Sequence, residues 1–154
     1  MAVNNIIKRL QNIMRSDAGI NGDAQRIEQM TWIFFLKVYD SQEETWEFKA
    51  VSEGKRFESI IPEQFRWRNW AVDEKDGKAL TGDALLEFIN GPEGLFNTLK
   101  TLPVDTSTPH GKSIVREVFS DLNQYMKNGI LLRQVINVID EIDFSDADDR
   151  HTFG

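Results

Sequence analysis

Residues 17–28 have the spacing of a calcium-binding loop between two expected helices. Asp17 and Glu28 occupy the first and twelfth positions, where such a loop places carboxylate ligands. Gly22 stands at the sixth position, where the chain must turn sharply. The third position, however, is Gly19, whose side chain offers no oxygen. The spacing therefore supports one alternative function, a stand-alone helical protein-binding module that calcium regulates through the Asp17–Glu28 loop.

Other patterns that could support catalysis or cofactor binding are incomplete. Gly111-Lys112-Ser113 matches the end of a phosphate-binding loop, but the glycine required five residues earlier is replaced by Thr106. The two histidines, His110 and His151, have no further ligand at the close spacing that zinc sites show. No serine has a paired base at a recognisable spacing. We therefore expect no catalytic, cofactor-binding or metal-binding residues in this chain.

Two groups of basic residues are candidates for contact with DNA or with a partner subunit. One is a face of the first expected helix that carries no acid, and the other is the basic-aromatic run 65–70. Arginine beside an aromatic ring can hold phosphate and stack on a base. The competing and preferred interpretation of the second group is that its tryptophans pack under a loop while its arginines point to water. The candidate contact residues are Lys8, Arg9, Arg15, Arg66, Trp67 and Arg68.

The formal net charge of −7 comes mainly from the end of the chain. Residues 140–154 contain six acids and one arginine, so the first 139 residues carry a net charge of only −2. A nearly neutral body argues against tight DNA binding by this chain alone, which needs a basic surface. The sequence has no cysteine, no secretory signal and no apolar run near the ~20 residues of a membrane span. We expect a cytoplasmic protein with no membrane contact.

Apolar residues spaced three and four apart predict a mainly α fold, an irregular bundle of about five to six helices. The second helix should begin with Asp23 as its N-cap, run towards Trp46, and be the most buried. Residues 55–75 should form a short β-hairpin or an ordered loop. The other helices are expected at residues 3–14, 83–89, 92–99 with Pro92 in the first turn, 114–126 and 131–142.

The chain divides into a helical domain, residues 1–140, and an acidic segment, residues 141–154. The acidic segment ends on Phe153-Gly154, without a polar tail after them. We expect the acidic segment to be a linker towards a downstream domain of a longer protein.

Several segments occur in a fixed order and at a characteristic spacing along the chain. They are residues 6–10, 34–40, 61–67, 85–90, 135–144 and 149–154. This order and spacing resemble the N-terminal helical domain of the DNA-methylating (modification) subunit of bacterial type I restriction-modification systems. The likeness covers nearly the whole chain.

The resemblance implies a parent protein that is an S-adenosylmethionine-dependent, site-specific DNA adenine-N6 methyltransferase. The family's catalytic Asn-Pro-Pro-Tyr or Asn-Pro-Pro-Phe tetrapeptide is absent, because no two prolines are adjacent. Its glycine-rich cofactor turn is also absent, so S-adenosylmethionine is implied only for the full-length parent. The implied partners are a specificity subunit, a second modification subunit, a restriction subunit and duplex DNA. The implied role is subunit assembly and closure around DNA.

Overall fold

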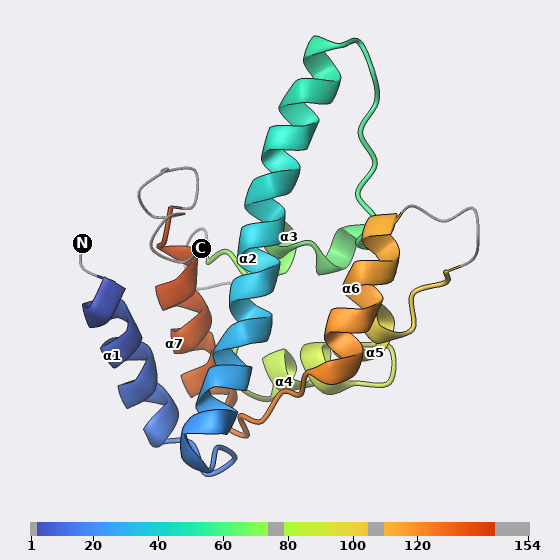
Figure 1. Ribbon diagram of the computed structural model, residues 1–154. Helices are drawn as coiled ribbons and strands as arrows, with labels where there is room; N and C mark the ends of the chain where they lie inside the picture. Colours follow the sequence, from blue (N-terminus) through green and yellow to red (C-terminus); the bar gives the residue numbers. More distant parts are fainter. Residues whose placement is uncertain (1–2, 74–78, 105–109, 144–154) are drawn as a thin grey trace.

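The computed structural model describes residues 3–73, 79–104 and 110–143, and within these ranges it is helical, with no strand (Figure 1). This confirms the predicted mainly α bundle. Of the two forms expected for residues 55–75, the described part, 55–73, is an ordered segment and not a hairpin, and it contains a 3-10 helix and a one-turn helix. The elements are α1 (Val3–Arg15), α2 (Gly22–Ser52), η1 (Glu63–Phe65), α3 (Trp67–Trp70), α4 (Gly82–Asn90), α5 (Leu95–Lys100), α6 (His110–Asp121) and α7 (Gly129–Asp140).

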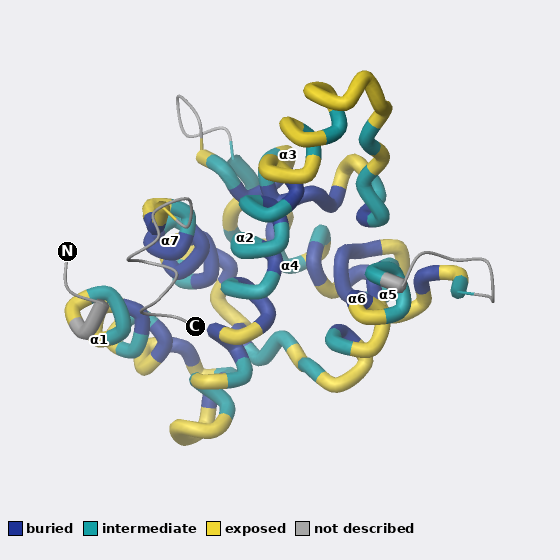
Figure 2. The backbone as a smooth tube through the Cα atoms, turned by 45° about the horizontal axis from the view of Figure 1, so that its top comes forward, coloured by how far each residue is buried: buried dark blue, intermediate teal, exposed yellow. Residues whose placement is uncertain are grey.

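Helix α2 is the longest element, with 31 residues and a length of about 46 Å. Its first half forms the centre of the bundle, as predicted, with Trp32, Ile33 and Leu36 buried. The helix continues to Ser52, beyond the predicted end, and contains no buried residue after Glu43. Its last turns therefore project from the bundle as a largely exposed segment (Figures 1 and 2).

The other helices pack beside α2 and against one another. Helices α1 and α4 contact α7, and α5 contacts both α4 and α6. Aromatic rings join α5 and α6 to α2, because Phe96 packs edge-on against Trp32 at 5.0 Å and against Phe119 at 5.2 Å between ring centres. Such edge-to-face pairs add to the free energy of burial. The buried side chains of all these helices, including the three aromatic rings, form one hydrophobic core.

Several predicted helix ends are wrong. Asn21, not Asp23, precedes the first residue of α2, and Asp23 lies in its first turn. Helix α5 begins at Leu95 after a turn closed by the hydrogen bond from Gly94 N–H to the Gly91 carbonyl, so Pro92 lies before the helix. Helix α7 begins at Gly129 and ends at Asp140, two residues earlier at each end than expected.

Helix α6 also differs from its prediction, since it spans His110–Asp121 and leaves residues 122–128 non-helical. Side chains from elsewhere satisfy the backbone of that segment. The Tyr125 N–H donates to the buried Gln29 side chain at 2.7 Å, and the Lys127 N–H donates to Asp17 at 2.9 Å. Tertiary hydrogen bonds thus replace the helical ones that periodicity alone predicts.

No helix in the described ranges has the length and apolar character needed to cross a bilayer. Residues 144–154, which include most of the predicted acidic linker and His151, lie outside the described residues.

Candidate functional site

Two arginines from the segment after η1 bind three acids on one face of α2. Arg66 lies 3.3 Å from Glu43 and 2.8 Å from Glu47. Arg68 lies 2.9 Å from Asp40 and 2.9 Å from Glu47. We call Asp40, Glu43, Glu47, Arg66 and Arg68 the charged brace. It fixes the turn at residues 63–70 against α2 at the point where the helix leaves the core.

Burial and pairing shift the pKa values of the brace in opposite directions. Burial raises the pKa of Glu43, against the lowering effect of a hydrogen bond from Ser59. For Glu47 burial also acts upward, but the hydrogen bonds from Arg66 and Arg68 outweigh it and the pKa is lowered. Burial, with the nearby charge of Glu43, raises the pKa of Tyr39 to about 12. Pairing with the two arginines therefore favours the ionised form of Glu47, whereas burial disfavours the ionised form of Glu43.

The neighbouring tryptophans pack in the core, as the preferred interpretation predicts. Trp67 is 2% exposed, and its indole N–H donates to Asp140 of α7 at 2.7 Å. The Trp70 indole N–H donates to the Phe65 carbonyl at 3.0 Å. The expectation that Arg66 and Arg68 point to water is wrong, because carboxylates of α2 bind both. A signal for this pairing was present, since Asp40, Glu43 and Glu47 share one face of a helix at spacings of three and four.

The structure places the other three candidate residues on α1. Lys8, Arg9 and Arg15 are all exposed, while Leu10 and Met14 on the opposite side of the helix are fully buried. Arg9 lies 3.7 Å from Glu141, beyond the end of α7. The first group of candidates thus forms an accessible basic face, well separated in the chain from the brace. A role of any of the six residues in contact with DNA or a subunit stays a prediction.

Asp17 of the calcium-like loop has a structural role. Its side chain is buried and accepts hydrogen bonds from the backbone N–H groups of Gly19 at 2.7 Å, Lys127 at 2.9 Å and Asn128 at 2.8 Å. These bonds tie the turn after α1 to the N-terminus of α7. Across residues 3–73, 79–104 and 110–143, no group of three or more histidines or acids is placed to hold a metal ion. The calcium-regulated alternative is therefore not supported.

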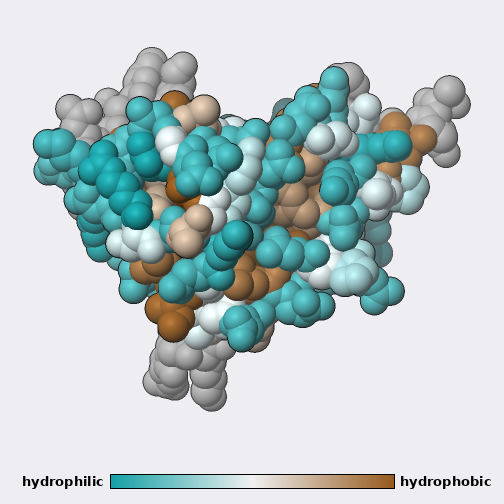
Figure 3. Space-filling model, turned by 90° about the horizontal axis from the view of Figure 1, so that it is seen from below, coloured by the Kyte–Doolittle hydropathy of each residue, from teal (hydrophilic) through white to brown (hydrophobic). Residues whose placement is uncertain are grey.

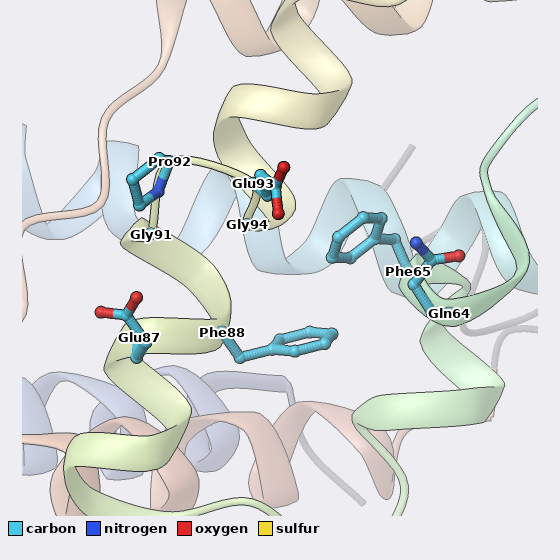
Figure 4. Close-up of a pocket in the computed structure, with 8 residues that line it drawn as sticks. All are labelled: Gln64, Phe65, Glu87, Phe88, Gly91, Pro92, Glu93 and Gly94. Carbon is cyan, nitrogen blue, oxygen red and sulfur yellow. The ribbon is translucent and has the colours of Figure 1, made fainter.

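The surface also has a groove of about 600 Å³ between η1 and the turn that joins α4 to α5 (Figure 4). Phe65 and Phe88 both line it and pack against each other, with ring centres 5.3 Å apart. Glu87 and Glu93 lie on its α4–α5 side. The lining pairs no nucleophile with a base, so the groove does not resemble an active site.

One surface feature was missed by sequence reasoning. Large apolar side chains are exposed in the projecting part of α2, with Phe48 79% and Val51 76% exposed. The sequence signal was their position in a stretch rich in charged residues, 43–58, which is typical of a solvent-exposed segment. Exposed apolar residues that lie close together mark interaction surfaces more often than isolated ones do.

The sequence is similar to known proteins along its whole length. The family of HsdM N-terminal domains matches residues 3–139. The chain is 49% identical over 156 residues to the type I restriction enzyme EcoEI methylase subunit of Escherichia coli, covering all of this chain and 30% of that protein. The chain thus spans about a third of the length of this relative.

Two solved structures share the fold. A modification subunit of a putative type I restriction enzyme from Vibrio vulnificus YJ016 matches 97% of this chain and 32% of its own, with a TM-score of 0.86 and 38% identity. A chain from work on complex assembly and conformational transition of the type I R-M system matches 98% of this chain and 28% of its own, with a TM-score of 0.78 and 32% identity. These matches confirm the resemblance inferred from the sequence. The chain belongs to the HsdM N-terminal domain family, the N-terminal domain of the modification subunits of type I restriction-modification systems.

Proposed function

We propose that this domain is a non-catalytic assembly and DNA-closure module of a type I DNA adenine-N6 methyltransferase subunit. The observation that carries the proposal is the match of the HsdM N-terminal domain family to residues 3–139, in a sequence without the Asn-Pro-Pro-Tyr or Asn-Pro-Pro-Phe tetrapeptide. Catalysis and S-adenosylmethionine binding would belong to the remainder of a longer parent protein. Such a protein acts on cellular DNA, which agrees with the expected cytoplasmic location.

Methylation of adenine in a duplex requires the base to leave the stack and enter a pocket. An enzyme that does so must hold the DNA on more than one side while the base is extruded. We assign this domain to that task, together with a specificity subunit, a second modification subunit and, in the complete assembly, a restriction subunit. One similar chain comes from work on complex assembly and conformational transition of the type I R-M system, which supports the assignment.

The basic face of α1 is the surface we assign to the DNA backbone. Lys8 and Arg15 are seven residues apart, so they lie on the same side of the helix, and both are exposed. The first turn of α1 contains no acid. Two cations on one accessible face suit two phosphate contacts, which strengthen binding without reading sequence.

The test uses the assembled modification and specificity subunits and a DNA duplex with the recognition site. The variant Lys8→Gln/Arg15→Gln should weaken DNA binding and reduce the slope of log affinity against log salt by about 0.9 per lost phosphate contact. The control Lys100→Gln/Lys127→Gln removes the same charge from two other exposed positions. Equal effects of the two double variants would contradict the proposed contact, because they would reflect net charge alone. Methyl transfer by the isolated 154-residue chain would contradict its non-catalytic role.

A further inference from the structure

The end of α2 presents apolar side chains to solvent. We call residues 44–52 the arm. Phe48 and Val51 are 79% and 76% exposed, and because they are three residues apart they lie on one face of the helix. Trp46, also on the arm, is 43% exposed and packs edge-on against Tyr39. At the opposite end of the bundle, by contrast, hydrophobic residues form separate patches between hydrophilic ones (Figure 3).

The arm is held in a fixed direction. It continues the same helix that forms the centre of the bundle, and the charged brace binds its base through Glu43 and Glu47. Figure 1 shows it extending past the neighbouring helices. A rigid apolar surface loses little conformational entropy when it is covered, so even a small patch can support binding.

The charges on and after the arm do not favour nucleic acid. Residues 44–58 carry three cations and four acids, a net charge of −1; they are Lys49, Lys55, Arg56, Glu44, Glu47, Glu53 and Glu58. With no net positive charge, this surface would gain nothing from release of the counterions around DNA. Its exposed phenylalanine and valine instead suit the apolar part of a protein surface.

The chain leaves the domain beside the base of the arm. A groove of about 270 Å³ is lined on one side by Lys37, Asp40, Ser41 and Glu44 of α2 and on the other by residues 140–143. Lys37 lies 3.3 Å from Asp140, the last residue of α7. The relatives are about three times as long as this chain, which covers 30% of one and 32% of another. A domain that follows this chain would therefore be tethered to a point at the base of the arm.

The geometry points to docking of the arm, through Phe48 and Val51, on the domain that follows in the same polypeptide. This inference rests on the proposed function, in which that domain is the methyltransferase. The tether raises the effective concentration of the two surfaces to about the millimolar range, so a patch of this size suffices. The docked arm then sets the position of the basic face of α1 relative to the methyltransferase domain.

The test uses the full-length modification subunit and limited digestion with trypsin. Lys55 and Arg56 are exposed and follow the arm directly, so docking should slow cleavage at these two sites. The variant Phe48→Asp/Val51→Asp should speed that cleavage by about tenfold or more, because it opposes burial of two apolar side chains. The control Ile27→Asp/Ile130→Asp changes two other exposed apolar residues, 60% and 59% accessible, and should leave the rate unchanged.

Hydrogen exchange on the same proteins separates docking from misfolding. In the arm variant, protection should fall in residues 44–60 while residues 129–140 of α7 keep theirs. If protection falls in both segments, the double variant has unfolded the domain. The single variant Phe48→Ser, which removes the ring without adding charge, then replaces it and should still speed cleavage.

Three outcomes would overturn the inference. Equal cleavage of the wild type, the arm variant and the control means that nothing covers the arm. Protection that grows with protein concentration assigns it to a second copy, and protection that needs the specificity subunit assigns it to that subunit. The salt dependence measured for Lys8→Gln/Arg15→Gln does not involve the arm, so it tests the proposed function separately.

Discussion

The guanidinium of Arg66 lies 3.3 Å from the carboxylate of Glu43, and only 8% and 1% of these two side chains are exposed. A buried ion pair gains attraction but loses the hydration of both charges, so it adds little net stability. The main effect of such a pair is to fix the position of the two segments that it joins. In this domain the pair fixes the segment after η1 against α2, at the base of the arm.

Replacing Arg66 with methionine should lower the free energy of unfolding by about 3–5 kcal/mol, because Glu43 would remain buried without its cation. Urea unfolding followed by circular dichroism measures the change. The control Arg56→Met removes a nearby exposed arginine, and its effect should stay within about 0.5 kcal/mol. Similar losses for the two variants would mean that the brace does not determine stability.

Glu47→Gln should destabilise the domain more than Glu43→Gln at pH 7, by about 1 kcal/mol. The reason is that the folded protein favours the ionised form of Glu47, whose pKa is lowered, and disfavours that of Glu43, whose pKa is raised. The two isosteric substitutions serve as controls for each other. A larger loss for Glu43→Gln would contradict this assignment of charge.

The same two variants should respond to pH in opposite ways. The stability that ionised Glu47 contributes is present above the unfolded-state pKa, near 4.5, and is lost as the pH falls below it. The cost of Glu47→Gln should therefore shrink on acidification. Glu43 has a raised pKa, so the wild type loses stability relative to Glu43→Gln as the pH rises above 4.5. Urea titrations at several pH values between pH 7 and the acid limit of folding measure both trends.

Asp17→Asn should destabilise the domain by about 1–3 kcal/mol, because backbone N–H groups of Lys127 and Asn128 lose a charged acceptor. Thermal unfolding measures the loss. Calcium added at millimolar concentration should not raise the melting temperature of the wild type, since the Asp17 oxygens already accept these hydrogen bonds. A saturable rise would restore the calcium-regulated alternative.

Gly129→Ala should disrupt the start of α7. A Cβ atom at Gly129 would collide with backbone atoms of Gly82, which cannot move like a flexible side chain. We expect a loss above about 3 kcal/mol, in the range of severe packing defects. The control Gly54→Ala has free space around the new methyl group, and its positive φ of 70° should cost only about 1 kcal/mol. Equal losses would show that helices α4 and α7 separate easily.

Sequence reasoning located most of the helices because their determinants are local. Helix α1 shows a buried face of Leu10 and Met14 opposite exposed basic residues, and the apolar middle of α2 indicates its central place. These patterns follow from the helical repeat alone. The helix ends were less accurate, as at α6, because the N–H groups of Tyr125 and Lys127 donate to the side chains of Gln29 and Asp17 and not to helical carbonyls.

The sequence alone determined the fold class, the family resemblance and the lack of the methyltransferase tetrapeptide, since periodicity and ordered motifs are properties of the chain itself. Only the tertiary structure decided that Arg66 and Arg68 bind α2 rather than water, that Asp17 anchors the turn before α7, and that Phe48 and Val51 remain uncovered. Each of these depends on which residues from distant segments meet. Pairing and burial are set by that packing, which the spacing of residues along the chain does not specify.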